Sequence, residues 1–572
     1  MWDEMSQERQ LCHLADESGS SRITRLARYP AVFIGALFAV WFVGPTNIWP
    51  TNRNWVLFGD LRLAELHWDF YRHTSIFQFP IAGTPNYVRV EPHPILFHFP
   101  FKLLNQVLPS EFQFVGLSLV IFFGLQAFVA VKIFRALGLP PLQANIGAVM
   151  MTLTPLLIFR TGQLSHAMLG GHFLMLTAVY FYSKKVSRFT NWAVLLLVTS
   201  FLDMYLLVVM LTIFMAHSIR EILYDSRSII RQARLQFFTG GLIFLSLLIQ
   251  GYFANPSALV AKYSFRLNIA AFFNPHFAPG LNFSTVLPRI STFFDRTISS
   301  EEIEGFAYLG LGLIFLVCFG CIRLFWTFSR KDLFQWGPIS FVALFWAYVS
   351  VSQNAVIFRR EFRLPELPGL NAITDIFRAA PRFIVLLYYL LIILGIVQVS
   401  RVSRKKSIAV SCLALLASLQ TIDTSRGVQI AHRTISTPKE SSPILDGEVW
   451  KSFSDYTHLK IYPVYDFHSD FNGRLANYWI EDDRWYPLVS FAARSQMTSN
   501  FGYLSRENLQ YTRLENASTI ADLRSGNLAP CTLYGVPGRE IWNSLSKNVR
   551  QSQITLSADG YYIIASDKST CG

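Results

Sequence analysis

Charged residues are scarce in this sequence. Only 15% of its 572 residues are Asp, Glu, Lys or Arg, whereas 52% are hydrophobic and 15% are aromatic. Soluble domains carry about 25% charged residues, so the composition excludes an ordinary soluble protein. A helix needs roughly 20 apolar residues to cross about 30 Å of hydrocarbon, and the chain offers many such runs. We therefore expect a membrane protein.

The common signatures of nucleotide binding and metalloprotease chemistry are also missing. The chain has no G-x-G-x-x-G, P-loop or H-E-x-x-H motif. Cys318 and Cys321 have C-x-x-C spacing, but they lie inside an apolar run without partner ligands, so we predict no metal site there. No small-residue cleavage site follows the apolar run that begins at Ala31, and we expect that run to remain as an uncleaved signal anchor.

The apolar runs predict a polytopic α-helical membrane protein with about eleven transmembrane helices. The fifth and sixth runs form one apolar block with Asp203 and Tyr205 at its centre, where we expect the tip of a helical hairpin. The predicted passes are 30–47, 114–134, 143–159, 167–183, 191–202, 203–217, 235–253, 306–325, 335–353, 379–399 and 407–422.

Lys and Arg residues give the predicted orientation, because they are enriched in cytoplasmic loops. We assign the tail 1–29 to the cytoplasm, the transmembrane domain to 30–422 and an extracytoplasmic soluble domain to 423–572. The net charge of +13 lies mostly at loop ends, where it suits anionic lipid headgroups, so we expect no nucleic-acid partner. The basic residues of the predicted cytoplasmic loops include Arg22, Arg25, Arg28, Lys132, Arg135, Lys184, Lys185, Arg188, Arg220, Arg231, Arg323, Arg330, Arg401 and Arg404.

The predicted soluble domain differs in composition, since it is charged and rich in Asn and Ser. Alternating stretches at 459–465 and 561–566 indicate strands, so we expect a small α/β or mostly β domain. Cys531 and Cys571 are alone in this oxidising compartment, which favours a disulfide over two unpaired thiols. The domain has no visible catalytic constellation.

The first predicted exported loop, residues 48–113, is rich in acidic residues, Arg and His. Loops of this length usually carry a function. Helical spacing over 60–73 and an apolar piece at 94–108 predict two juxtamembrane helices. Aromatic residues at 68, 70 and 71 suit a helix that lies in the headgroup layer.

Short motifs in and after this loop resemble an uncharacterised bacterial family of multi-pass membrane proteins in the GT-C glycosyltransferase clan. The resemblance covers most of residues 50–400, and the sequence departs from the pattern at 91–99. Its motifs are Gly59-Asp60, Trp68-Asp69-Phe70-Tyr71-Arg72, Phe79-Pro80-Ile81-Ala82-Gly83, Glu304-Gly305-Phe306-Ala307-Tyr308-Leu309-Gly310 and Phe377-Arg378-Ala379-Ala380-Pro381-Arg382-Phe383.

The resemblance implies a GT-C-like fold in the bacterial inner membrane. It also implies transfer of a sugar from a polyprenyl-phosphate donor to a cell-envelope acceptor, such as a glycan, on the outer face. An inverting transfer needs a carboxylate as general base. We expect Asp60 in this role, with Glu65 and Asp69 as further catalytic candidates; the other interpretation of Asp60 is a helix cap.

The leaving phosphate needs cations, and Arg side chains at exported helix ends are suited to it. We expect Arg72, Arg160, Arg378 and Arg382 to bind the donor, although single Arg residues also snorkel to headgroups. A divalent metal is left open as a cofactor. Residues expected to line the cavity are Glu91, His93, His166, Glu304 and Tyr308.

Two other functions remain open. An O-antigen-type polymerase or ligase also uses exported Arg residues, with the key residues in later loops. A lipid or polysaccharide transporter or flippase would explain the many helices, but no inverted repeat or pair of broken helices is evident.

Overall fold

The computed structural model describes most of the chain. The described residues are 29–56, 61–83, 95–186, 188–253, 265–278, 281–288, 300–358, 360–365, 368–369, 373, 376–377, 379–402, 405–437, 444–462, 485–501, 509–536, 539–545, 547, 549 and 553–571.

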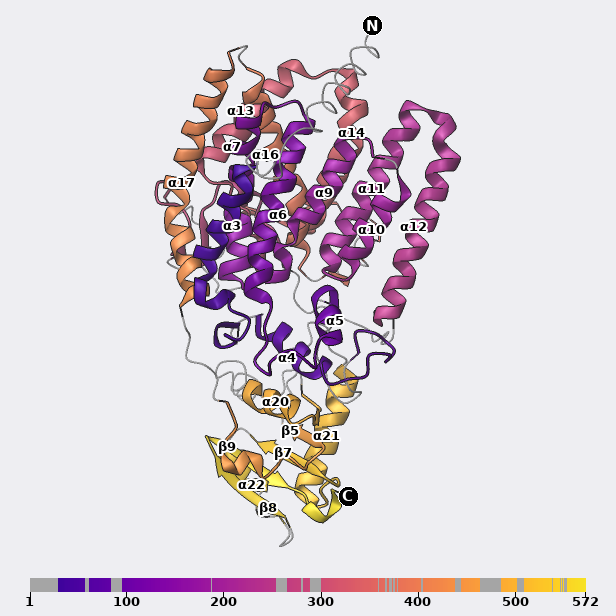
Figure 1. Cartoon of the computed structure of the whole chain (residues 1–572), viewed down its shortest axis with the longest axis vertical. Helices are drawn as coiled ribbons and strands as arrows, with labels where there is room; N and C mark the ends of the chain where they lie inside the picture. Colours follow the sequence, from indigo (N-terminus) through magenta and orange to yellow (C-terminus); the bar gives the residue numbers. More distant parts are fainter. Residues whose placement is uncertain are drawn as a thin grey trace.

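A bundle of helices makes up the larger part of the molecule, and each of the eleven predicted apolar ranges contains a helix (Figure 1). Among the described residues, seven helices are long and apolar enough to cross a membrane, and four shorter helices are also apolar. The bundle helices are α3 (Pro30–Val43), α6 (Val115–Ala136), α7 (Pro141–Thr152) with α8 (Pro155–Ile158) and η3 (Phe159–Gln163), η4 (Ala167–Gly170) with α9 (His172–Ser183), α10 (Phe189–Ser200), α11 (Met204–Tyr224), α12 (Ile229–Gln250), α13 (Leu311–Thr327), α14 (Arg330–Val351), η9 (Ala380–Ile384) with α16 (Val385–Ser400), and α17 (Lys406–Ser436).

The predicted break inside the apolar block at 191–217 is confirmed. Helix α10 ends at Ser200 and α11 begins at Met204. Asp203 is the N-cap of α11, where its Oδ1 accepts a hydrogen bond of 2.8 Å from the backbone N–H of Leu206. A capping carboxylate explains an acidic residue in this apolar stretch.

Helix α17 is longer than predicted. The sequence predicts its end at 422, but the helix continues to Ser436 and is about 46 Å long at 1.5 Å per residue. The second half is polar and still packs on the bundle, because His432 stacks on Trp41 with ring centroids 4.3 Å apart. The helical bundle therefore extends past the predicted boundary at 423.

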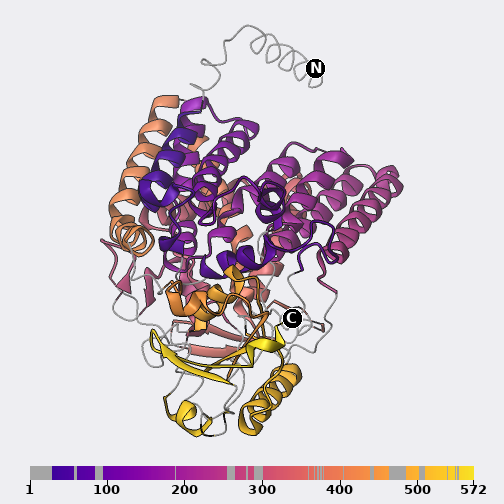
Figure 2. The same ribbon diagram turned by 60° about the horizontal axis from the view of Figure 1, so that its bottom comes forward.

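The basic loop ends of the bundle meet at one end. Arg323 donates hydrogen bonds to the carbonyls of Gln398, at 3.2 Å, and Arg401, at 3.0 Å. Gln143 donates to the carbonyl of Lys406 at 3.3 Å. The two short helices of the first loop and the C-terminal domain lie at the opposite end, and Figure 2 shows α17 and α12 on opposite sides of the bundle.

Both predicted helices of the first loop are present, as α4 (Leu61–Tyr71) and α5 (Ile95–Leu103). Figure 1 places them between the bundle and the C-terminal domain. Trp68, Phe70 and Tyr71 are buried in protein contacts, so these three aromatic side chains do not point outward from the molecule. The reason is tertiary: the bundle covers α4 on one face and the C-terminal domain covers it on another.

The C-terminal domain is of the α/β type, as one of the two predictions had it. Its sheet has the strand order β6-β5-β7-β9-β8, in which β5 runs parallel to β6 and β7, and β9 runs antiparallel to β7 and β8. A disulfide joins Cys531 and Cys571, as predicted. The elements are α18 (Glu448–Lys451), β5 (His458–Ile461), α20 (Trp485–Arg494), β6 (Thr498–Ser499), α21 (Leu509–Ser525), β7 (Thr532–Val536), α22 (Arg539–Leu545), β8 (Ile554–Ala558), β9 (Tyr561–Ala565) and η11 (Lys568–Thr570).

Short elements complete the fold between the long helices. They are η1 (Pro45–Ile48), η2 (Asn54–Val56), η5 (Ser226–Ser228), η6 (Ile269–Phe272), η8 (Ser300–Gly305), and the two hairpins β1 (His276–Ala278) with β2 (Leu281–Asn282) and β3 (Asn354–Ile357) with β4 (Arg360–Arg363).

Candidate functional site

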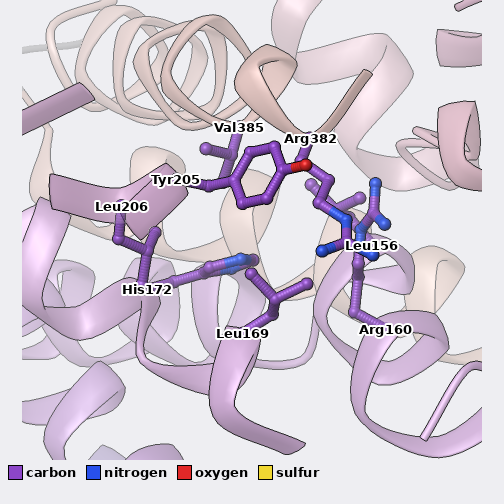
Figure 3. Close-up of a pocket in the computed structure, with 8 residues that line it drawn as sticks. All are labelled: Leu156, Arg160, Leu169, His172, Tyr205, Leu206, Arg382 and Val385. Carbon is purple, nitrogen blue, oxygen red and sulfur yellow. The ribbon is translucent and has the colours of Figure 1, made fainter. Parts of the chain in front are cut away.

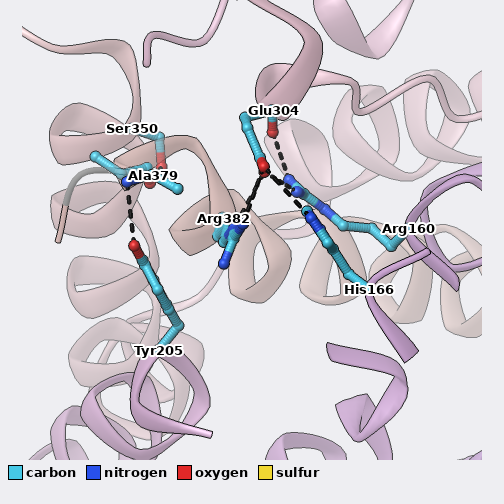
Figure 4. A network of polar contacts seen from close by, with 8 residues as sticks. Arg160, His166, Tyr205, Glu304, Ser350, Ala379 and Arg382 are labelled. Atoms are coloured by element: carbon cyan, nitrogen blue, oxygen red, sulfur yellow. Dashed lines mark hydrogen bonds and ion pairs between the residues drawn. The ribbon is translucent and has the colours of Figure 1, made fainter. Parts of the chain in front are cut away.

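A cluster of charged side chains forms where three interrupted helical segments meet (Figure 4). Arg160 belongs to η3, a π-helical turn, which is a distortion frequent at functional sites. Arg382 belongs to η9 at the start of α16, and Glu304 belongs to η8. Three residues that are far apart in the sequence thus come into contact in the fold.

Glu304 accepts hydrogen bonds from both guanidinium groups. Arg382 donates from Nε to Oε2 at 3.1 Å and from Nη2 to Oε1 at 2.9 Å, so this contact is bidentate. Arg160 donates to Glu304 Oε2 and to its backbone carbonyl. His166 Nε2 lies 3.8 Å from Oε1 of the same carboxylate. The structure therefore unites four of the predicted residues.

The cluster has an excess of positive charge. Among the described residues, two guanidinium groups contact the carboxylate of Glu304, and the three side chains are 3%, 20% and 9% exposed for Arg160, Arg382 and Glu304. The more distant carboxylate of Asp203 also acts on Arg382 through its charge. Burial acts to raise the pKa of Glu304, but Arg382, His166 and Arg160 outweigh it and hold that pKa well below its usual range. A buried cation without an equal counter-charge attracts an anion.

The two Arg residues also line a small pocket (Figure 3). Arg382 lies over the ring of Tyr205, 4.9 Å from its centroid. Tyr205 in turn accepts a hydrogen bond of 3.1 Å from the backbone N–H of Ala379. The residues that line the pocket are Leu156, Arg160, Leu169, His172, Tyr205, Leu206, Arg382 and Val385.

His172 contributes a polar side chain to the lining of this pocket. Its Nδ1 lies 3.1 Å from the hydroxyl of Tyr389, and that hydroxyl also accepts a hydrogen bond of 3.0 Å from Gln126. Sequence reasoning missed Tyr389 and Gln126, because both lie in the middle of apolar runs and only their side-chain types set them apart.

Tyr308 belongs to a different polar group, although it follows Glu304 closely in the sequence. Its hydroxyl donates to Oδ2 of Asp423 at 2.6 Å. Ser284 donates to Oδ1 of Asp423, and the backbone N–H of Leu311 donates to Oδ2 at 2.9 Å. This group fastens α17 to the start of α13. Tyr308 does not line the pocket described above.

Glu65 and Asp69 lie together in a second ionic cluster on α4. Arg53 binds both: its Nε lies 3.2 Å from Glu65 Oε2, and its Nη2 donates to Asp69 Oδ2. Burial raises the pKa of Glu65 to about 8, although the charge of Arg53 acts to lower it. Burial therefore favours the protonated form of Glu65, although its side chain still contacts Arg53. Arg53 is a further residue that sequence reasoning missed.

Arg72 lies apart from the pocket. Its guanidinium donates to Asn105 Oδ1 at 2.8 Å and to the carbonyls of Ser110, at 2.8 Å, and Pro109, at 3.1 Å. These bonds secure the end of the first loop and occupy the side chain that the sequence assigns to donor binding.

Four predicted site residues lie outside the described residues, namely Asp60, Glu91, His93 and Arg378. Helix α4 begins at Leu61, directly after Asp60 in the chain. Within the part of the chain that the structure describes, no group of three or more His, Cys, Asp or Glu side chains is placed to hold a metal ion.

Comparison with known proteins gives a family and no activity. A search of curated proteins finds no match. The profile described as "Domain of unknown function (DUF6311)" matches residues 32–425, and the profile of the "DUF6311 C-terminal domain" matches residues 449–566. The first match covers the helical bundle from α3 to the middle of α17, and the second covers the α/β domain from α18 to β9. The chain therefore belongs to the DUF6311 family and carries both of its domains.

Proposed function

We propose that this protein is a glycosyltransferase of the GT-C type, which moves a sugar from a polyprenyl-phosphate donor to a cell-envelope acceptor. The observation that carries the proposal is the pocket beside the Arg160, Arg382 and Glu304 cluster, where a buried and a partly buried guanidinium group bind one carboxylate. An apolar pocket wall with an excess cation suits a lipid phosphate better than it suits a soluble anion or a neutral ligand.

The proposal places the helical bundle in the bacterial inner membrane with eleven crossings and a cytoplasmic N-terminus. Seven long apolar helices and four shorter ones support it. Large apolar side chains also point outward from the bundle: Leu37 is 68% exposed, Phe237 76% and Phe341 73%. Exposed aromatic residues on this scale need an apolar solvent. The charged cluster then lies toward the extracytoplasmic end, with α4 and the α/β domain.

The charge of the cluster fits the donor chemistry. A sugar linked to a polyprenyl monophosphate is a phosphodiester with one negative charge, and the leaving polyprenyl phosphate gains a second charge as the bond to the sugar breaks. The guanidinium groups of Arg160 and Arg382, which line the pocket, stabilise that change. In the same step the acceptor hydroxyl oxygen bonds to the anomeric carbon and releases its proton to a general base.

We assign the general base to Asp60, which directly precedes α4 in the sequence. Its carboxylate takes the acceptor proton while the phosphate leaves with the electron pair of the broken bond. Glu65 and Asp69 are less suited, because Arg53 binds both and each is at least 96% buried. Arg160 and Arg382 hold the phosphate, and Glu304 holds their two guanidinium groups next to each other through hydrogen bonds.

The test uses the full chain, purified and placed in lipid nanodiscs with a panel of radiolabelled polyprenyl-phosphate hexoses and pentoses and an envelope fraction as acceptor. We expect label to move into the acceptor, and we expect Asp60→Asn and Arg382→Ala each to lower the rate at least 100-fold. Arg323→Ala is the matched control, because Arg323 also donates two hydrogen bonds to backbone carbonyls but lies at the other end of the bundle.

Other outcomes separate the competing functions. Label that accumulates only from a polyprenyl-diphosphate donor, with full activity in Asp60→Asn and loss in Arg382→Ala, would indicate an O-antigen-type polymerase or ligase. Movement of the labelled lipid between leaflets without transfer would indicate a flippase. Wild-type transfer in both variants would contradict the assigned site.

A further inference from the structure

Helix α4 has three different faces, and each faces a different part of the molecule. Leu61, Trp68 and Tyr71 pack into the core of the helical bundle. Leu66 and Phe70 pack instead into the core of the C-terminal domain. Residues three or four apart share one helical face, so the two cores meet α4 on separate sides.

The face of α4 that contacts the C-terminal domain packs mainly against α20. The Arg62 guanidinium lies 5.3 Å from the ring centroid of Trp485, and Leu66 and Phe70 follow at intervals of four residues. Leu66 is 0% exposed and Phe70 is 3% exposed. The core of the C-terminal domain is thus incomplete without two side chains that come from the first loop.

The third face of α4 is ionic, and the C-terminal domain covers it as well. Tyr486 of α20 is buried beside the ion cluster of Arg53, Glu65 and Asp69, whose charges all act on it. Its pKa is raised above its usual range, mainly by burial. Buried charges are costly unless protein groups surround them completely, and α20 completes the enclosure here.

From these contacts we propose that the C-terminal domain is a clamp on the first loop. Helix α20 fixes the position and rotation of α4, and Trp485 and Tyr486 are positioning residues for α4. The effect on transfer rests on the proposed function, because it requires Asp60 to be the general base. The clamp itself does not depend on any activity.

The clamp is tested without an activity assay. A protease site is placed within residues 438–443, between α17 and α18, and the purified full chain is cut there in detergent. We expect the two fragments to elute together, because the interface with α4 holds them. Phe70→Asp places a charge in the shared core, and we expect its fragments to separate after cleavage.

The matched control is Leu514→Asp, which adds the same charge at a side chain of α21 that is 63% exposed. Its fragments should stay together. Separation of the wild-type fragments, or fragments of Phe70→Asp that stay together, would overturn the clamp. Before cleavage, size-exclusion chromatography of the intact variant shows whether the bundle remains folded.

The positioning role is tested by kinetics in the transfer assay. We expect Trp485→Ala to lower kcat about tenfold with an unchanged KM for the donor, and we expect Trp485→Phe to restore most of the rate, since a ring under Arg62 is kept. Wild-type kcat in Trp485→Ala would refute this role. If the wild-type chain shows no transfer at all, the proposed function fails while the co-elution result still decides the clamp.

Discussion

At the residue scale, two clusters of charged side chains differ in the number of acidic and basic groups that they bring into contact. Arg160 and Arg382 share one carboxylate, whereas Glu65 and Asp69 share one guanidinium. The first group has an excess positive charge and lies beside a pocket. In the second group, burial raises the pKa of Glu65 to about 8, whereas the charges of Arg53 and Arg72 act to lower it.

The proton on Glu65 makes the stability of the protein depend on pH. The folded chain holds it up to about pH 8, whereas the unfolded chain releases it near pH 4.5. The folded state therefore binds more protons between these values, and the unfolding free energy falls as pH rises through that window. The fall is at most about 5 kcal/mol, from about 1.4 kcal/mol for each pKa unit.

Glu65→Gln keeps the shape of the side chain and removes the proton equilibrium. Between pH 5 and 8, we expect the stability of this variant to depend less on pH than the stability of the wild type does. At pH 9, we expect the variant to unfold at a higher temperature than the wild type. Tryptophan fluorescence during heating measures both. Glu448→Gln is the control, since that side chain is 90% exposed. If the unfolding temperatures of Glu65→Gln and the wild type change with pH in the same way, Glu65 is not the source of this pH dependence.

At the element scale, α17 is the helix that joins the most distant parts of the fold. It contacts α13 along its first half and reaches α3 and η3 with its second half. Small residues make the close contact with α13 feasible. A Cβ atom on Gly312 would lie 2.1 Å from the backbone oxygen of Leu416, so the two helices touch through backbone atoms.

Gly312→Ala should therefore destabilise the bundle strongly. Neither backbone can yield without moving a helix, and we expect a loss of more than about 3 kcal/mol. Gly240→Ala on α12 is the matched control, because an added Cβ there meets nothing within 4 Å. That change should be neutral or stabilise by about 0.5–1 kcal/mol. Melting temperatures of the two purified variants give the comparison, and equal values would show that α13 and α17 are loosely packed.

At the scale of the whole molecule, two cores are joined through the first loop. The bundle core is built from long helices, and the core of the C-terminal domain is much smaller. The Cys531–Cys571 disulfide closes a span of 40 residues that includes β7, β8 and β9, three of the five strands. A small domain with a small core gains much from such a cross-link.

Loss of the disulfide should affect the C-terminal domain and leave the bundle intact. We expect the double variant Cys531→Ala/Cys571→Ala to lower the unfolding free energy of that domain by about 2–4 kcal/mol. Limited proteolysis followed by mass spectrometry should then find new cuts between residues 531 and 571. Cys412→Ser, at an exposed free cysteine, is the control. Unchanged proteolysis in the double variant would contradict this prediction.

The sequence predicts those features that depend on interactions between residues close together in the chain. The apolar helices, the break before Asp203 and the Cys531–Cys571 bond are recognisable because composition and local spacing carry them. The end of α17 is different. Residues 423–436 are polar, and they remain helical because Asp423 and His432 find partners on other elements.

The ionic clusters depend on contacts between residues far apart in the chain, and the sequence does not predict such contacts. Arg160 and Glu304 are 144 residues apart, and their contact has no local signal. Each was a candidate for a different role, whereas the structure pairs them. The sequence gives no reason to single out Arg53, because one Arg within a long loop resembles any other. Its importance comes from two carboxylates one helical turn apart on α4.

The shared core around α4 has a consequence for the order of synthesis. Ribosomes make α4 long before α20, so Leu66, Phe70 and the ion cluster have no cover while the rest of the bundle is still being translated. At ordinary elongation rates this interval lasts on the order of tens of seconds. During that time the first loop exposes an apolar surface that favours non-specific association. A nascent chain that stops before α20 would therefore be a natural target for chaperones and proteases, however well its helices have formed.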